Sequence, residues 1–115
     1  SSGAEAGANN VIKDVVTVTG ATYQVQNADY YIGVRSGSQS TPGPCKVTLP
    51  TNPVKGRTVI VKDESGASSQ YPITVVTPEG RVGKESEIDS AIGEAALAQD
   101  NGSVSLVFNN GWRII

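Results

Sequence analysis

The strongest structural signal in this chain is Thr48-Leu-Pro-Thr-Asn-Pro-Val-Lys-Gly-Arg-Thr-Val-Ile-Val-Lys-Asp-Glu-Ser-Gly66. The stretch predicts two strands joined by a turn, because apolar residues alternate before Pro50 and β-branched residues gather after Arg57. Pro50 and Pro53 end the first strand, since proline has no N–H to donate to a sheet. The stretch contains no obvious catalytic group, so it favours a structural or binding protein over an enzyme.

The same alternation recurs along the chain and predicts about eight short strands. We expect them within residues 11–19, 22–26, 30–35, 46–49, 57–62, 73–77, 103–108 and 112–115. Between the last two, Asn109-Asn110-Gly111 can supply the positive φ angles of a tight hairpin turn. The sequence therefore predicts an all-β fold, a compact antiparallel β-sandwich or jelly roll.

Length and composition predict one domain over residues 11–115, with residues 1–10 as a flexible lead. The chain has no Met, so we expect it to be a fragment or a processed product, with residues 1–3 as a remnant of an expression tag. The net charge is −2 and the basic residues are scattered, so no nucleic-acid partner is expected. No apolar run approaches the length of a membrane span, so no membrane insertion is expected.

The residue types and their spacing do not favour a catalytic or metal-binding site. The chain has no His, which excludes a Ser-His-Asp arrangement and leaves Cys45 without a base. The best acidic cluster is Glu85, Glu87 and Asp89, which would share one face of a strand and repel one another. We interpret these acids as solvated surface and expect no enzyme activity, no cofactor and no metal.

Several motifs follow one another in a recognisable order. They are Asp29-Tyr30-Tyr31-Ile32, Val47-Thr-Leu-Pro50, Lys55-Gly-Arg-Thr-Val-Ile-Val-Lys-Asp63, Ile73-Thr-Val75, Ile88-Asp89, Gly102-Ser-Val-Ser-Leu-Val-Phe108 and Trp112-Arg-Ile114. This order resembles β modules at the distal ends of tailed-bacteriophage fibres, tail needles and head fibres. The resemblance covers about residues 29–115.

The resemblance implies a homotrimer of compact β domains, a jelly-roll or tumour-necrosis-factor-like knob on the outside of a virion. Such a module would be assembled in the host cytoplasm and joined to the rest of the appendage through its N-terminal side. It would attach the virion to a host surface glycan or protein. The resemblance also implies that residues 94–98 are extended, although Ala-rich composition and the spacing within 84–100 keep a helical turn as the alternative.

Recognition is expected on loops 36–44 and 65–70 and on two tyrosines, because loops on a rigid scaffold usually carry binding residues. The candidate contact residues are Tyr31, Ser38, Gln39, Ser68, Gln70 and Tyr71. Tyr30 shares a strand face with Ile32 and is expected in the core.

Subunit contacts are expected where strands carry apolar residues on both faces, since a small sandwich buries only one face of each sheet. The candidate interface residues are Ile60, Val76, Val107 and Ile115. A carbohydrate-binding or adhesin module of a bacterial surface protein is the alternative, and it predicts a monomer with an aromatic-lined sugar site. A weaker third hypothesis is an enzymatic tailspike fragment.

Overall fold

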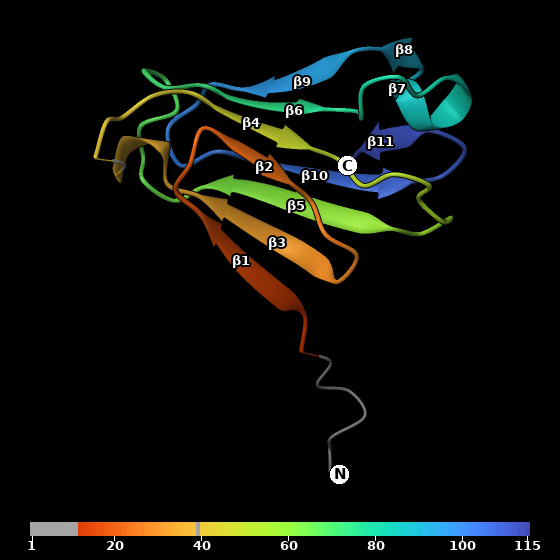
Figure 1. The fold of residues 1–115 in the computed structure, drawn as a ribbon, viewed down its shortest axis with the longest axis horizontal. Helices are drawn as coiled ribbons and strands as arrows, with labels where there is room; N and C mark the ends of the chain where they lie inside the picture. Colours follow the sequence, from red (N-terminus) through yellow and green to blue (C-terminus); the bar gives the residue numbers. More distant parts are fainter. Residues whose placement is uncertain (1–11, 39) are drawn as a thin grey trace, which may run out of the picture.

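The computed structural model describes residues 12–38 and 40–115, and in this part of the chain two β-sheets pack against each other (Figure 1). The larger sheet contains, in spatial order, β1 (Asp14–Val18), β3 (Asp29–Val34), β5 (Thr58–Asp63), β10 (Ser103–Phe108), β11 (Trp112–Ile114), β7 (Glu87–Ile88) and β8 (Ala91–Ile92). The smaller sheet contains β2 (Thr22–Gln24), β4 (Cys45–Thr48), β6 (Ile73–Val76) and β9 (Glu94–Leu97). Two short 3-10 turns, η2 (Ser36–Ser38) and η3 (Gly83–Ser86), lie between strands. The all-β fold class is confirmed.

The antiparallel arrangement expected from the sequence is wrong for the first half of the chain. The chain alternates between the sheets, so that β1, β3 and β5 lie side by side in the larger sheet and β2, β4 and β6 in the smaller one. All four of these pairings are parallel. Antiparallel pairing is confined to the later strands, between β5 and β10, β10 and β11, β6 and β9, and β7 and β8.

The reason for the difference lies in the turns. Each early turn carries the chain across to the opposite sheet instead of folding it back against the strand just completed. Neighbours within a sheet are therefore two strands apart in sequence and run in the same direction. A period of two fixes which side chains are buried, but it carries no information on the direction of the neighbouring strand.

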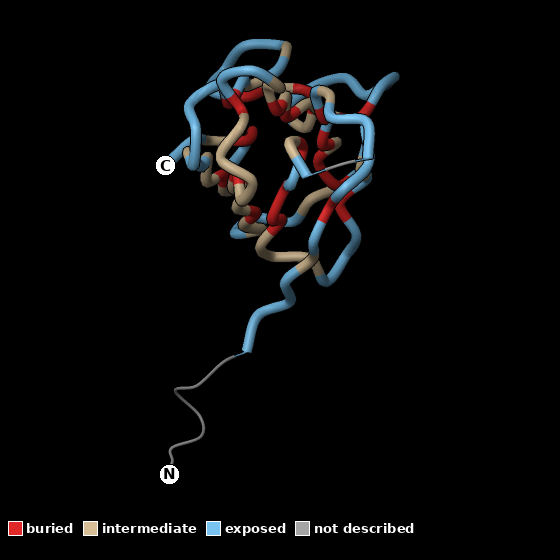
Figure 2. The backbone as a smooth tube through the Cα atoms, turned by 90° about the vertical axis from the view of Figure 1, so that its left-hand side faces the viewer, coloured by how far each residue is buried: buried red, intermediate tan, exposed pale blue. Residues whose placement is uncertain are grey.

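The core lies between the two sheets and follows the predicted alternation. Figure 2 shows the buried segments within the body of the sandwich and exposed segments in its outer turns. Fully buried apolar side chains come from both sheets and include Ile32, Val34, Val47, Val59, Val61, Ile73, Val75, Leu106 and Trp112. Trp112 packs edge-on against Phe108, with ring centroids 5.4 Å apart. One aromatic pair thus fills the end of the core beneath the last hairpin.

The segment that was ambiguous in the sequence is largely extended. Residues Glu94–Leu97 form β9, which pairs with β6 and buries Leu97, as the resemblance implied. The only helical turn nearby, among the residues described, is η3, which ends at Ser86, before the Ala-rich stretch begins at Ala95. The described residues include no helix that is both long and apolar enough to cross a membrane.

Candidate functional site

The loops expected to carry recognition come together at one end of the sandwich. Strands β1, β3 and β5 end in register there, because Val18 pairs with Val34 and Val34 pairs with Asp63. We call the residues 36–38, 65–71 and 99–102 at this end the loop cluster; it lies at the left of Figure 1. The parallel strands begin at the opposite end, where Asp14 pairs with Asp29.

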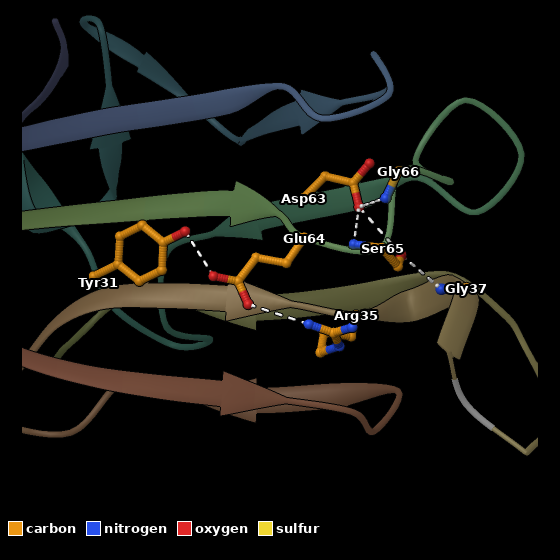
Figure 3. Close-up of polar contacts among 7 residues, drawn as sticks. All are labelled: Tyr31, Arg35, Gly37, Asp63, Glu64, Ser65 and Gly66. Atoms are coloured by element: carbon orange, nitrogen blue, oxygen red, sulfur yellow. Dashed lines mark hydrogen bonds and ion pairs between the residues drawn. The ribbon is translucent and has the colours of Figure 1, made fainter.

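The buried carboxylate of Asp63 holds the loop cluster together. Its Oδ1 accepts hydrogen bonds from the backbone N–H groups of Ser65 and Gly66, at 3.1 and 3.0 Å (Figure 3). Its Oδ2 accepts from the N–H groups of Ser68 and Asn101, at 3.1 and 2.9 Å. One side chain therefore fixes two loops that are far apart in the sequence.

Burial on its own would raise the pKa of Asp63, because a charged group loses hydration inside the protein. The hydrogen bonds from Asn101, Ser68 and Gly66 outweigh that effect and hold the pKa below its usual value. The group is thus an ionised structural anchor and is poorly suited to act as a general acid or base near neutral pH. The sequence analysis missed this role, although an Asp followed by Ser and Gly at a strand end is a typical turn signal.

A second contact joins loop 36–38 directly to loop 65–71. The backbone N–H of Gly37 donates to Ser65 Oγ at 3.0 Å (Figure 3). A Cβ at Gly37 would lie 2.6 Å from the Cβ of Ala67, so the loops approach more closely than any other residue would allow. Ser69 N–H donates to Asp100 Oδ1 at 2.9 Å and ties in the third loop. The loop cluster is therefore cross-braced by contacts among all three of its segments.

Beside the loop cluster, three polar side chains on the outer face of β3 and β5 contact one another in series. The Tyr31 hydroxyl donates to Glu64 Oε2 at 2.7 Å, and Arg35 Nη1 lies 3.8 Å from Glu64 Oε1 (Figure 3). Glu64 lies over Gly33, where a Cβ would come within 2.4 Å of the Glu64 Cδ. Desolvation, reinforced by the bond to Glu64, raises the pKa of Tyr31 to about 12. The phenol thus stays protonated at neutral pH and acts as a hydrogen-bond donor.

The structure separates the six candidate contact residues. Ser38 and Gln70 are exposed in the loop cluster and Tyr71 is half-buried there, whereas Gln39 lies outside the described residues. Tyr31 is half-buried on the outer face of the larger sheet.

Ser68 is fully buried, so its prediction as a contact residue is wrong. It is drawn inward because its N–H bonds Asp63 and its hydroxyl donates to the carbonyl of Gln99.

The acidic residues of the 85–89 segment do not converge. Glu85 accepts from the backbone N–H of Asn52, Glu87 lies 3.5 Å from the Lys84 ammonium, and Asp89 accepts from the N–H of Ile114. Across residues 12–38 and 40–115, no three metal-ligating side chains form a group. Each acid is thus committed to a local structural contact.

The hollow at the start of β1 does not resemble an aromatic-lined sugar site, and Cys45 does not resemble a reactive thiol. A hollow of about 460 Å³ at the start of β1 is lined by Tyr30, Lys13 and Arg57, among others. Its one aromatic ring is already covered, because Lys13 Nζ lies 5.0 Å from the Tyr30 ring centroid. Cys45 is buried, and desolvation raises the pKa of its thiol, which opposes formation of a reactive thiolate.

Comparison with known proteins adds no family assignment: the chain matches no family model and no curated protein sequence.

Proposed function

We propose that this chain is a non-enzymatic, homotrimeric module of a tailed-bacteriophage appendage, a fibre, needle or head-fibre domain that engages the host cell surface. The observation that carries the proposal is the position of the loop cluster. It is braced by Asp63 and lies at the end of β1, β3 and β5 that is opposite to the start of β1. A module attached through its N-terminal side would therefore hold the loop cluster away from the virion.

The chemistry of the polar groups agrees with a binding role. Asp63, Glu64 and Tyr31 are occupied with contacts inside the chain. Ser38, Ser69, Gln70 and Gln99 are exposed in the loop cluster and are neutral hydrogen-bonding groups, and Asp100 is the exposed acidic residue among them. Neutral polar side chains on a rigid loop suit weak contacts with surface glycans or proteins. Three such sites on one head would gain avidity through their high effective concentration.

The proposal is tested by binding of the fluorescently labelled chain to a panel of bacterial strains, measured by flow cytometry. We expect saturable binding to at least one strain. The variant Q70A/Y71A should bind at least tenfold more weakly. The control K46A changes an exposed residue on the outer face of β4 and should bind like the original chain.

Two results would contradict the proposal. Absence of binding to every strain would remove the attachment role, and equal binding by Q70A/Y71A would remove the loop cluster as the contact surface. A monomer that binds a glycan array would instead favour the carbohydrate-binding or adhesin module of a bacterial surface protein.

A further inference from the structure

The hollow of about 460 Å³ at the start of β1 lies at the end of the sandwich opposite the loop cluster. Its lining includes the side chains of Lys13, Asp14, Tyr30, Arg57 and Thr58. The volume falls within the range of small-molecule sites, about 300–1,000 Å³. Two of the lining side chains are cationic and one is acidic, so the hollow carries a net positive charge.

The backbone fixes the guanidinium of Arg57 at the wall of the hollow. Its Nη1 donates to the carbonyls of Asp29 and Thr58, at 2.6 and 3.1 Å, and its Nη2 donates to the carbonyl of Gln26 at 2.9 Å. These contacts use three of the five N–H groups of a guanidinium and leave two for a ligand. A guanidinium that is already held in place loses little freedom when it binds an oxyanion.

The charge of Arg57 is partly removed from water without a carboxylate bonded to it. Desolvation lowers the pKa of Arg57, and the nearby charge of Asp29 offsets only part of that effect. The Asp29 carboxylate itself accepts from the Tyr23 hydroxyl and from the N–H of Gln26. Among residues 12–38 and 40–115, neither Arg57 nor Lys13 forms an ion pair with a carboxylate. An anion bound beside Arg57 would therefore reduce the cost of its desolvation.

Lys13 supplies the second positive charge of the hollow. Its ammonium lies 5.0 Å from the centroid of the Tyr30 ring, a distance at which the ring attracts a cation. The N–H donors on the side away from the ring remain available to a ligand. Asp14 is the acid in the same lining, and its exposed carboxylate would repel an anion.

We propose that this hollow binds a small oxyanion, a carboxylate or phosphate group, with Arg57 and Lys13 as its hydrogen-bond donors. A ligand with one acidic group fits better than a polyanion, because Asp14 would repel further negative charge. The site is separate from the loop cluster, and the proposal does not depend on attachment to a host or on the number of subunits.

The test is a titration of the ¹⁵N-labelled chain with inorganic phosphate and with glucuronate at constant pH, followed by NMR. We expect at least one of these anions to shift the amide signals of Lys13, Tyr30, Gly56 and Arg57 at millimolar concentration. Neutral glucose should shift none of them. A response to phosphate alone would identify the ligand group as a phosphate, and a response to glucuronate alone would identify it as a carboxylate.

Three single substitutions at exposed charged residues test the sign of each contribution. K13A should weaken binding about twofold to fivefold, as expected for one exposed charge pair. D14N should strengthen binding by a similar factor, because it removes the repelling charge. K46A, on the outer face of β4, should leave the affinity unchanged. Arg57 is kept in all variants because its contacts to three carbonyls hold the turn before β3 against β5.

The contrary results are equally definite. Absence of shifts at these four amides with both anions would overturn the proposal. Equal affinities of K13A, D14N and K46A would also overturn it, since binding would then be a general ionic effect. The proposed host attachment is measured separately, on bacterial strains and at the loop cluster, so either proposal can fail alone.

Discussion

The carboxylate of Asp63 accepts a hydrogen bond at 2.9 Å from the backbone N–H of Asn101, which lies 38 residues further along the chain. This contact joins the end of β5 to the turn before β10. Because the same carboxylate also binds the turn that follows β5, a single side chain determines the shape of much of the loop cluster. The stability of that end of the molecule therefore depends on one buried ion.

Replacing Asp63 by Ala should destabilise the protein strongly. The substitution leaves several backbone N–H groups without an acceptor, and each such buried loss costs about 1–3 kcal/mol. We expect the free energy of unfolding to fall by about 3 kcal/mol or more, as measured by urea denaturation. The control is E79A, at an exposed residue, which should change it by less than about 0.5 kcal/mol. Equal midpoints for D63A and E79A would contradict the anchoring role.

The contribution of Asp63 should also depend on pH in a defined direction. Its pKa is lower in the folded protein than in the unfolded chain, where an Asp carboxyl has a pKa of about 3.9. The stabilisation is therefore complete above that unfolded value and is lost as pH falls through the lower folded pKa. We expect the difference in unfolding free energy between the original chain and D63N to shrink as pH is lowered from 7 to 2. A difference that grows on acidification would contradict this sign.

Two tyrosines should resist ionisation. Desolvation, followed by the bond to a carboxylate, raises the pKa of Tyr31 and of Tyr23 to about 12, with Glu64 and Asp29 as the respective acceptors. Absorbance at 295 nm should show a late ionisation phase that decreases in Y31F and in Y23F. A chain unfolded in urea should lack this phase, since free phenols titrate near pH 10. Loss of amplitude only from the early phase would count against these contacts.

Two glycines near the loop cluster should respond differently to alanine. At Gly37 the new methyl group would meet the Cβ of Ala67 at 2.6 Å, and a Cβ moves only with its backbone, so G37A should cost about 1–3 kcal/mol. At Gly33 it would meet the flexible end of Glu64, so G33A should cost less but lower the pKa of Tyr31 towards 10. The control G43A places its Cβ where nothing lies within 4 Å. Thermal denaturation and the tyrosine titration together check both effects.

The sequence predicted the strands well because apolar and polar residues alternate along a strand that is buried on one face. The alternation of Ile32 and Val34 with Tyr31 and Gly33, for example, matches the buried and outer faces of β3. It did not predict the parallel pairing of the early strands, since direction is set by where each turn leads the chain. The two-residue strands β7 and β8 were also missed, because so short a segment contains no full period.

The candidate contact residues were predicted less well than the fold. Composition correctly marked the two Ser-rich segments as loops, but it could not show that Asp63 would draw Ser68 into the interior. The candidate interface residues were chosen on apolar character alone. Apolar character identified Ile60, Val76, Val107 and Ile115 alike, while only strand order reveals that Val76 lies on the opposite sheet.

The most direct test of this account is the mass of the chain in solution, measured by multi-angle light scattering at micromolar concentration beside an unheated SDS gel. The account predicts a particle of three times the 11.9 kDa of one chain. A single species of 11.9 kDa would contradict the homotrimer.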